Sequence, residues 1–135
     1  MAGRDTAIYD KYGSPFTISK GGVSVVGTAA AITALAATTF KMPFKCKLRG
    51  ATRISTTGGT AAGPTVLAQY SLAGTGAWTS IGTCAFGTDA DGAGSDFSVT
   101  ETTLADGDHF RFAIAAGTAA ATHTANFVAE FTEVL

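Results

Sequence analysis

The stretch FKCKLRGATRIS, residues 44–55, alternates apolar and basic side chains and predicts a half-buried β-strand. Phe44, Cys46 and Leu48 fall on one face of such a strand, and Thr52 and Ile54 continue that face. Successive side chains of a strand point to opposite faces, so the basic residues between them fall on the outer face. These outer residues are Lys45, Lys47, Arg49 and Arg53. The stretch therefore predicts a sheet with one face in a core and a row of positive charge on the other.

The same period of two recurs along the rest of the chain, with glycine-containing turns between the runs. Seven or eight short strands and no convincing long helix predict an all-β, single-domain protein, an antiparallel sandwich or barrel. The residues expected to point inward are Val66, Ala68, Tyr70, Leu72, Phe97, Val99, Phe110, Phe112, Ile114, Phe127, Ala129 and Phe131.

The N-terminal part has weaker patterns. Residues 1–22 are expected to form an arm or extended segment, and residues 23–135 the β-sandwich domain. TAAAITALAATT, residues 28–39, combines alanines that favour a helix with threonines that disfavour one, and we expect extended structure there. Residues 21–40 carry no charge, but threonines and glycines dilute the run, so we expect neither an export signal nor a membrane span.

The composition favours contact with other proteins. Only 14% of the 135 residues are charged, and the chain holds 26 Ala, 22 Thr and 17 Gly. Such a chain has few long polar side chains to solvate a large free surface, although a sparsely charged free-standing domain also fits. Residues 1–53 carry eight Lys or Arg against two Asp, and residues 54–135 carry one Arg against eight acids, so oppositely charged regions can orient an association.

The stretch TTLADGDHFRFAIA, residues 102–115, brings Asp106, Asp108 and His109 together in sequence. Catalysis would require a nucleophile, a base within hydrogen-bond reach and a group that orients the base. Gly107 between the two acids is typical of a hairpin turn instead. We therefore expect a turn, no catalytic residue and no enzyme activity.

Metal and cysteine chemistry are also not expected. Asp89, Asp91 and Asp96 resemble the opening of a calcium loop, but Gly92 comes too early and the twelfth position counted from Asp89 is Thr100 instead of Glu. We expect no metal and no cofactor. The two cysteines, Cys46 and Cys84, are expected to be small buried side chains, with a single bridge between them as the alternative.

The basic row and Trp78 are the two candidate binding features. Lys45, Lys47, Arg49 and Arg53 fit an acidic protein partner or neighbouring subunit, and they equally fit an edge strand that positive charge protects from unwanted pairing. No aromatic residues are interleaved for base stacking, so we expect no nucleic-acid binding. Trp78 fits a carbohydrate platform or packing beside a turn.

TTFKMPFKCKLRGATRIS, GPTVLAQYSLAGTGAWTSIGT and TLADGDHFRF, with a last alternating strand, resemble the jelly-roll proteins of tailed-phage virions over residues 38–134. These proteins serve as capsid decoration or cement proteins and as related fibre or collar modules. The matching elements are Pro43-Phe44, Gly63-Pro64, the turn at residues 74–78, and Leu104 with Gly107-Asp108.

The resemblance implies a jelly-roll β-sandwich that acts as a non-enzymatic structural protein. Its expected partners are the major capsid protein or other virion proteins, in a homo-oligomer for which a trimer is favoured. Its expected location is the virion, assembled in the host cytoplasm. The alternative function is a carbohydrate- or receptor-binding module of a phage fibre, with Trp78 as a possible ligand contact.

Overall fold

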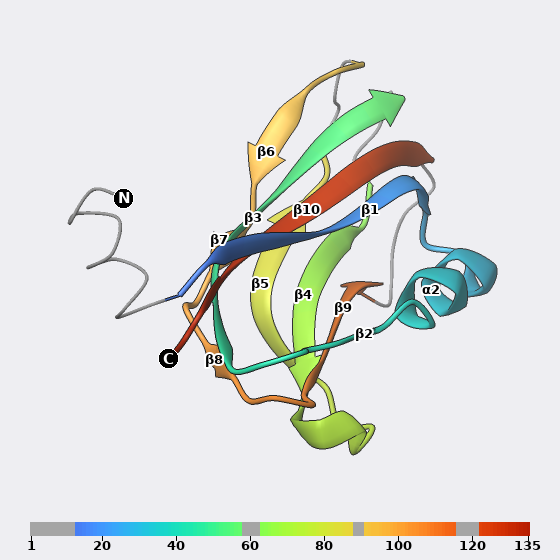
Figure 1. Ribbon diagram of the computed structural model, residues 1–135. Helices are drawn as coiled ribbons and strands as arrows, with labels where there is room; N and C mark the ends of the chain where they lie inside the picture. Colours follow the sequence, from blue (N-terminus) through green and yellow to red (C-terminus); the bar gives the residue numbers. More distant parts are fainter. Residues whose placement is uncertain (1–12, 58–62, 88–90, 116–121) are drawn as a thin grey trace, which may run out of the picture.

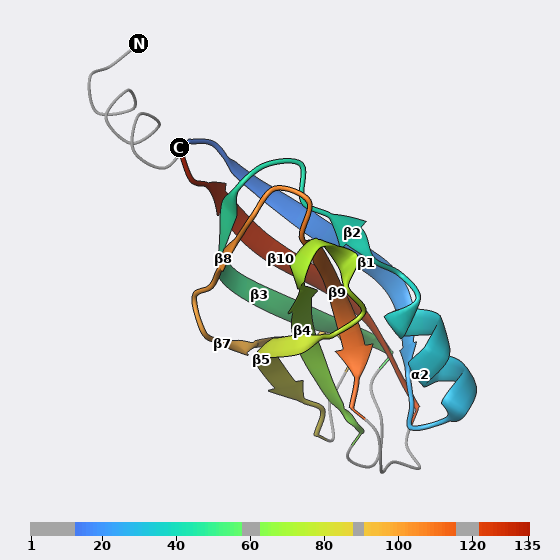
Figure 2. The ribbon, with the colours of Figure 1, turned by 90° about the horizontal axis from the view of Figure 1, so that it is seen from below.

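A computed structural model describes residues 13–57, 63–87, 91–115 and 122–135 (Figure 1). Over these residues the strands form two five-stranded antiparallel sheets that pack face to face, which confirms the all-β sandwich (Figure 2). Sheet A consists of β1 (Pro15–Val25), β10 (His123–Glu133), β3 (Cys46–Thr57), β6 (Gly94–Asp96) and β8 (Thr103–Leu104). Sheet B consists of β2 (Phe40–Lys41), β9 (His109–Ile114), β4 (Thr65–Ser71), β5 (Thr79–Ala85) and β7 (Ser98–Val99).

The order of pairing is that of a jelly roll. β1 pairs with β10, β2 with β9, β3 with β8 and β6, and β4 with β5. β1 thus pairs with the last strand, β2 with the last but one, and β3 with β8, which is the nested pairing of a long hairpin rolled into two sheets.

The core lies between the two sheets and is rich in aromatic side chains. Phe110 and Phe112 of β9 face Phe127 and Phe131 of β10 across the sandwich. The ring centroids of Phe110 and Phe131 are 5.2 Å apart, as are those of Phe112 and Phe127. Aromatic rings at this separation add favourable contact beyond the area they bury. The inward faces predicted for β9 and β10 are confirmed at these positions, and on β4 Val66 and Ala68 are buried while Tyr70 is partly buried against the core. Leu72, also predicted inward, is exposed in the short helix η1 (Leu72–Gly74).

The expectation of extended structure at residues 28–39 was wrong, because residues Ala29–Ala36 form helix α2. The Thr28 hydroxyl accepts a hydrogen bond from the Ala31 backbone N–H at 3.3 Å and caps the helix start. Five of its eight residues are alanine, the best helix former, and Leu35 anchors it in the core. α2 lies between β1 and β9 at one side of the sandwich (Figure 2). None of the helices among the described residues has the length and apolar character needed to cross a membrane.

The first described strand begins before the expected domain boundary. β1 starts at Pro15 and pairs with β10 along its length, so the division after residue 22 falls inside a strand of sheet A. Residues 1–12 of the predicted arm lie outside the described residues.

Both cysteines are buried and free, which confirms the expectation of small buried side chains without a bridge between them. Cys46 lies in β3 of sheet A and Cys84 in β5 of sheet B. Burial, with a smaller effect of the nearby Asp108 charge, raises the pKa of the Cys46 thiol to about 11. This thiol stays protonated near neutral pH and packs as a small apolar group.

Candidate functional site

The Asp106–His109 stretch forms a turn, as predicted. The Asp108 side chain is buried, with 4% of its surface exposed. One carboxylate oxygen accepts a hydrogen bond from the Ala105 backbone N–H and the other from the Ala73 backbone N–H, both at 2.9 Å. Ala73 has a left-handed φ of 46°, so this bond holds a strained turn in place. The buried Asp108 side chain therefore links two turns through its hydrogen bonds, and Asp106 is exposed beside it.

The acidic loop before β6 offers little to a metal ion in the described residues. Asp89 lies outside them, and Asp91 and Asp96 are exposed. Across residues 13–57, 63–87, 91–115 and 122–135, no group of three or more His, Cys, Asp or Glu side chains is placed to hold a metal ion.

A β-bulge in β3 changes the face on which the basic residues lie. Leu48 pairs with Phe131 and Gly50 with Glu130 of β10, so Arg49 is an extra residue on the β3 side. A one-residue insertion inverts the alternation of every residue that follows. After the bulge, Ala51, Arg53 and Ser55 point inward, whereas Thr52, Ile54 and Thr56 point outward.

The prediction that Arg53 continues the outward row was therefore wrong. Arg53 is 4% exposed, and its guanidinium carbon lies 4.2 Å from the centre of the Phe86 ring. It also donates a hydrogen bond to the Ser55 hydroxyl at 2.6 Å. The buried His123 packs against the same ring, with centroids 5.3 Å apart. Arg53 belongs to the interior at this end of the sandwich.

The other three basic residues remain outside the core, and an acid that the sequence did not nominate compensates two of them. Lys45 is exposed. Lys47 Nζ lies 2.9 Å and Arg49 Nη1 3.5 Å from the same Glu101 carboxylate oxygen. The hydrogen bond from Lys47, then the charges of Arg49 and Lys47, hold the pKa of Glu101 below its usual value. The positive charge at this end of β3 is thus partly neutralised within the chain.

We define the outer face of sheet A as the surface of β1, β10 and β3 that points away from sheet B. Figure 1 shows this face toward the viewer, with α2 beside it; no helix within the described ranges packs over it. Most of its side chains are small or β-branched, and Ile54 stands out with 52% exposure. Its residues are Pro15, Thr17, Ser19, Ser24, Lys47, Arg49, Gly50, Thr52, Ile54, Thr124, Asn126, Val128, Glu130 and Thr132.

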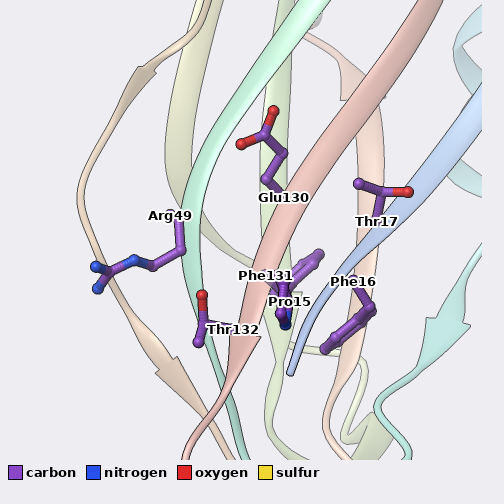
Figure 3. Close-up of a pocket in the computed structure, with 7 residues that line it drawn as sticks. All are labelled: Pro15, Phe16, Thr17, Arg49, Glu130, Phe131 and Thr132. Atoms are coloured by element: carbon purple, nitrogen blue, oxygen red, sulfur yellow. The ribbon is translucent and has the colours of Figure 1, made fainter. Parts of the chain in front are cut away.

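Two hollows lie on the outer face of sheet A, on either side of Arg49 and Glu130. One of about 440 Å³ is lined by Pro15, Phe16, Thr17, Arg49, Glu130, Phe131 and Thr132 (Figure 3). The other, of about 430 Å³, is lined by Arg49, Gly50, Ala51, Thr52, Asp96, Phe97, Val99 and Glu130.

The two charged residues common to the hollows differ in their contacts. Arg49 and Glu130 extend in different directions from adjacent strands (Figure 3). Arg49 reaches Glu101. In the part of the chain that the structure describes, the Glu130 carboxylate makes no hydrogen bond or ion pair.

Trp78 lies on the opposite side of the molecule, over the outer surface of sheet B. The Arg111 guanidinium carbon is 4.0 Å from the centre of its ring. Arg111 also donates to the Gln69 side-chain oxygen at 2.9 Å and to the Ala36 carbonyl of α2 at 3.3 Å. Trp78 is half-buried and has one ring face against Arg111, so it contributes to packing at this surface. Its role as a ligand contact stays a prediction.

Comparisons with known proteins give distant structural similarity. No protein-family model matches the chain, and no curated protein matches it in sequence. A chain in the structure described as the cyanophage Pam1 capsid asymmetric unit is 17% identical with a TM-score of 0.45, and the match covers 89% of this chain and 85% of that chain. The Eiger TNF structure from S. frugiperda is 9% identical with a TM-score of 0.39, covering 88% and 85% of the two chains. Similarity at this level does not identify a function for the chain.

Proposed function

We propose that this chain is a non-enzymatic structural protein of a phage virion, a capsid decoration or cement protein that binds the major capsid protein or another shell protein. The observation that carries the proposal is the outer face of sheet A. A whole face of the sandwich is left without a covering helix within the described ranges, it is hollowed at two places, and it holds both basic and acidic groups.

The chemistry of this face suits protein contact better than binding of a small molecule. The two hollows share Arg49 and Glu130 and lie next to each other on one sheet face, so they form parts of one broad surface that a protein partner can cover. Small side chains let another backbone approach closely, and an interface needs area and complementary shape more than reactive groups. The Asp106–His109 stretch is used as a turn, so the one catalytic candidate in the sequence has a structural task.

The shell contact is proposed for Lys45, Lys47 and Arg49, at the start of β3. Lys45 is exposed, and Lys47 and Arg49 present partly exposed side chains beside Glu101. Arg53 is left out of this surface because it is buried. The resemblance of residues 38–134 to virion jelly-roll proteins also supports the proposal.

The test is docking of the purified chain to shells of the source virus that lack it, measured by co-sedimentation. Lys45→Glu with Lys47→Glu is expected to weaken docking while the melting curve stays close to that of the wild type, since both side chains are on the surface. Asp106→Lys is the matched control, because it changes an exposed charge in a different turn. Unchanged docking of the double variant would refute the assignment of this surface.

A further inference from the structure

The centre of the outer face of sheet A carries a pair of opposite charges that is complementary to itself. Gly50 pairs directly with Glu130, and Arg49 is the bulged residue next to Gly50. Paired Cα atoms of antiparallel strands are about 4.5 to 5.5 Å apart, so Arg49 and Glu130 leave the face from neighbouring positions, with their side chains extending in different directions (Figure 3). A second copy placed by a two-fold axis through this point would bring its Glu130 to this Arg49 and its Arg49 to this Glu130.

We propose that the occupant of this face is a second copy of the same chain, joined by reciprocal Arg49–Glu130 pairs. This inference rests on the proposed role of the outer face as a protein-binding surface. It assigns the centre of that face, with Arg49, to a second copy, so the shell contact falls to Lys45 and Lys47 at the start of β3. The two-fold contact differs from the trimer that the family resemblance implies.

The exposure of both charged groups, and the lack of an ion pair at Glu130 among the described residues, support an intermolecular pairing. Glu130 is exposed and, among the described residues, has no hydrogen bond or ion pair of its own. The Arg49 side chain is 42% exposed, so a second copy can reach it while it contacts Glu101.

The surroundings of the pair are shaped for a second sheet. A Cβ built on Gly50 would meet no atom within 4 Å, so the space above this strand is open. Thr52 and Val128 pair beside it, and Ile54 and Asn126 pair one step further. Short and β-branched side chains in register allow two sheets to pack about 10 Å apart, and the exposed Ile54 adds apolar area to the contact.

A charge swap tests this pairing, with native mass measured by light scattering over a dilution series. The wild type is expected to be a dimer or an even multiple of one. Glu130→Arg and Arg49→Glu, made singly, are each expected to raise the dissociation constant at least about tenfold, because like charges then face each other. The double variant, with Arg49→Glu and Glu130→Arg, keeps the net charge and is expected to return to within about threefold of the wild type.

Several outcomes would overturn the inference. These are a wild-type monomer or trimer, single variants with wild-type mass, and a double variant that stays dissociated although its melting curve is normal. Asp106→Arg, which changes the charge of an exposed acid away from the outer face, is expected to keep the wild-type mass. If the double variant regains the wild-type mass, the partner of Arg49 and Glu130 is a second copy of the chain. The docking test with the Lys45 and Lys47 variant measures binding to the shell instead, so one proposal can be refuted while the other stands.

Discussion

Replacing Asp108 by Ala is expected to destabilise the fold by about 3 kcal/mol. The substitution removes two hydrogen bonds of 2.9 Å that a buried carboxylate accepts from the Ala73 and Ala105 backbone N–H groups. A hydrogen bond to a charged group contributes about 1.5 to 3 kcal/mol, and a buried donor left without a partner costs a similar amount. We take the lower end for each bond, because both donors are partly exposed and water can reach them.

Urea unfolding followed by tryptophan fluorescence measures this loss, with Asp106→Ala as the matched control. Asp106 is the exposed acid two residues earlier in the same turn, and its replacement is expected to change the free energy of unfolding by less than about 0.5 kcal/mol. If Asp108→Ala unfolds at the same urea concentration as Asp106→Ala, then the two hydrogen bonds of Asp108 do not stabilise the fold.

Four further predictions concern other parts of the molecule. Gly50→Trp is expected to fold, because Gly50 has open space above it and no left-handed φ, but it is expected to dissociate the oligomer. Gly87→Trp, at an equally open glycine, is the control. An intact Gly50→Trp oligomer in light scattering would contradict the docking surface. The pKa of Glu101 is lowered from 4.5 on folding, so its contribution to stability is present above 4.5 and is lost as the pH falls through the lowered folded value. The stability difference between the wild type and Glu101→Gln in urea unfolding should therefore shrink as the pH is lowered from neutral into the acid range. A difference that does not change with pH would disprove the ion pair. Because Cys46 and Cys84 are buried and the pKa of Cys46 is raised, an aromatic disulfide reagent at pH 8 should modify both thiols only after unfolding, and rapid labelling of the folded chain would contradict their burial. The fibre-module alternative predicts glycan binding on an array that Trp78→Ala removes without unfolding, whereas the decoration-protein proposal predicts no such binding.

The alternation of side chains predicted the layers of the sandwich well. In β9 the inward residues are Phe110, Phe112 and Ile114, and in β10 Phe127 and Phe131 alternate with polar or partly exposed residues on the outer face. Burial of one face leaves such a strand a single register, so the pattern alone identifies the core residues.

The same reasoning failed in β3 beyond Arg49, in the strand that carries the candidate site. The bulge at Arg49 depends on how β3 pairs with β10, a strand more than seventy residues away, and the alternation of residues 44–49 carries no sign of it. Gly50 was the one local signal, because a glycine inside a strand often marks a bulge. Once the bulge is included, Arg53 moves to the interior.

Two partners of the candidate residues come from distant parts of the chain. Glu101 reaches Lys47 and Arg49 from the segment between β7 and β8, and the Ala73 N–H reaches Asp108 across 35 residues. Neither contact follows from a local pattern. The helix α2 was missed for a different reason. The cap by Thr28 and the helix preference of the alanines are together stronger than the strand preference of the threonines.

The central claim, that the chain is a structural component of a virion shell, is tested most directly by immunogold electron microscopy of purified virions of the source virus. An antibody raised against the folded chain is expected to label the whole shell surface. Label confined to tail fibres would replace the decoration role with the fibre-module alternative, and intact virions without label that also lack the chain in their protein content would contradict the claim.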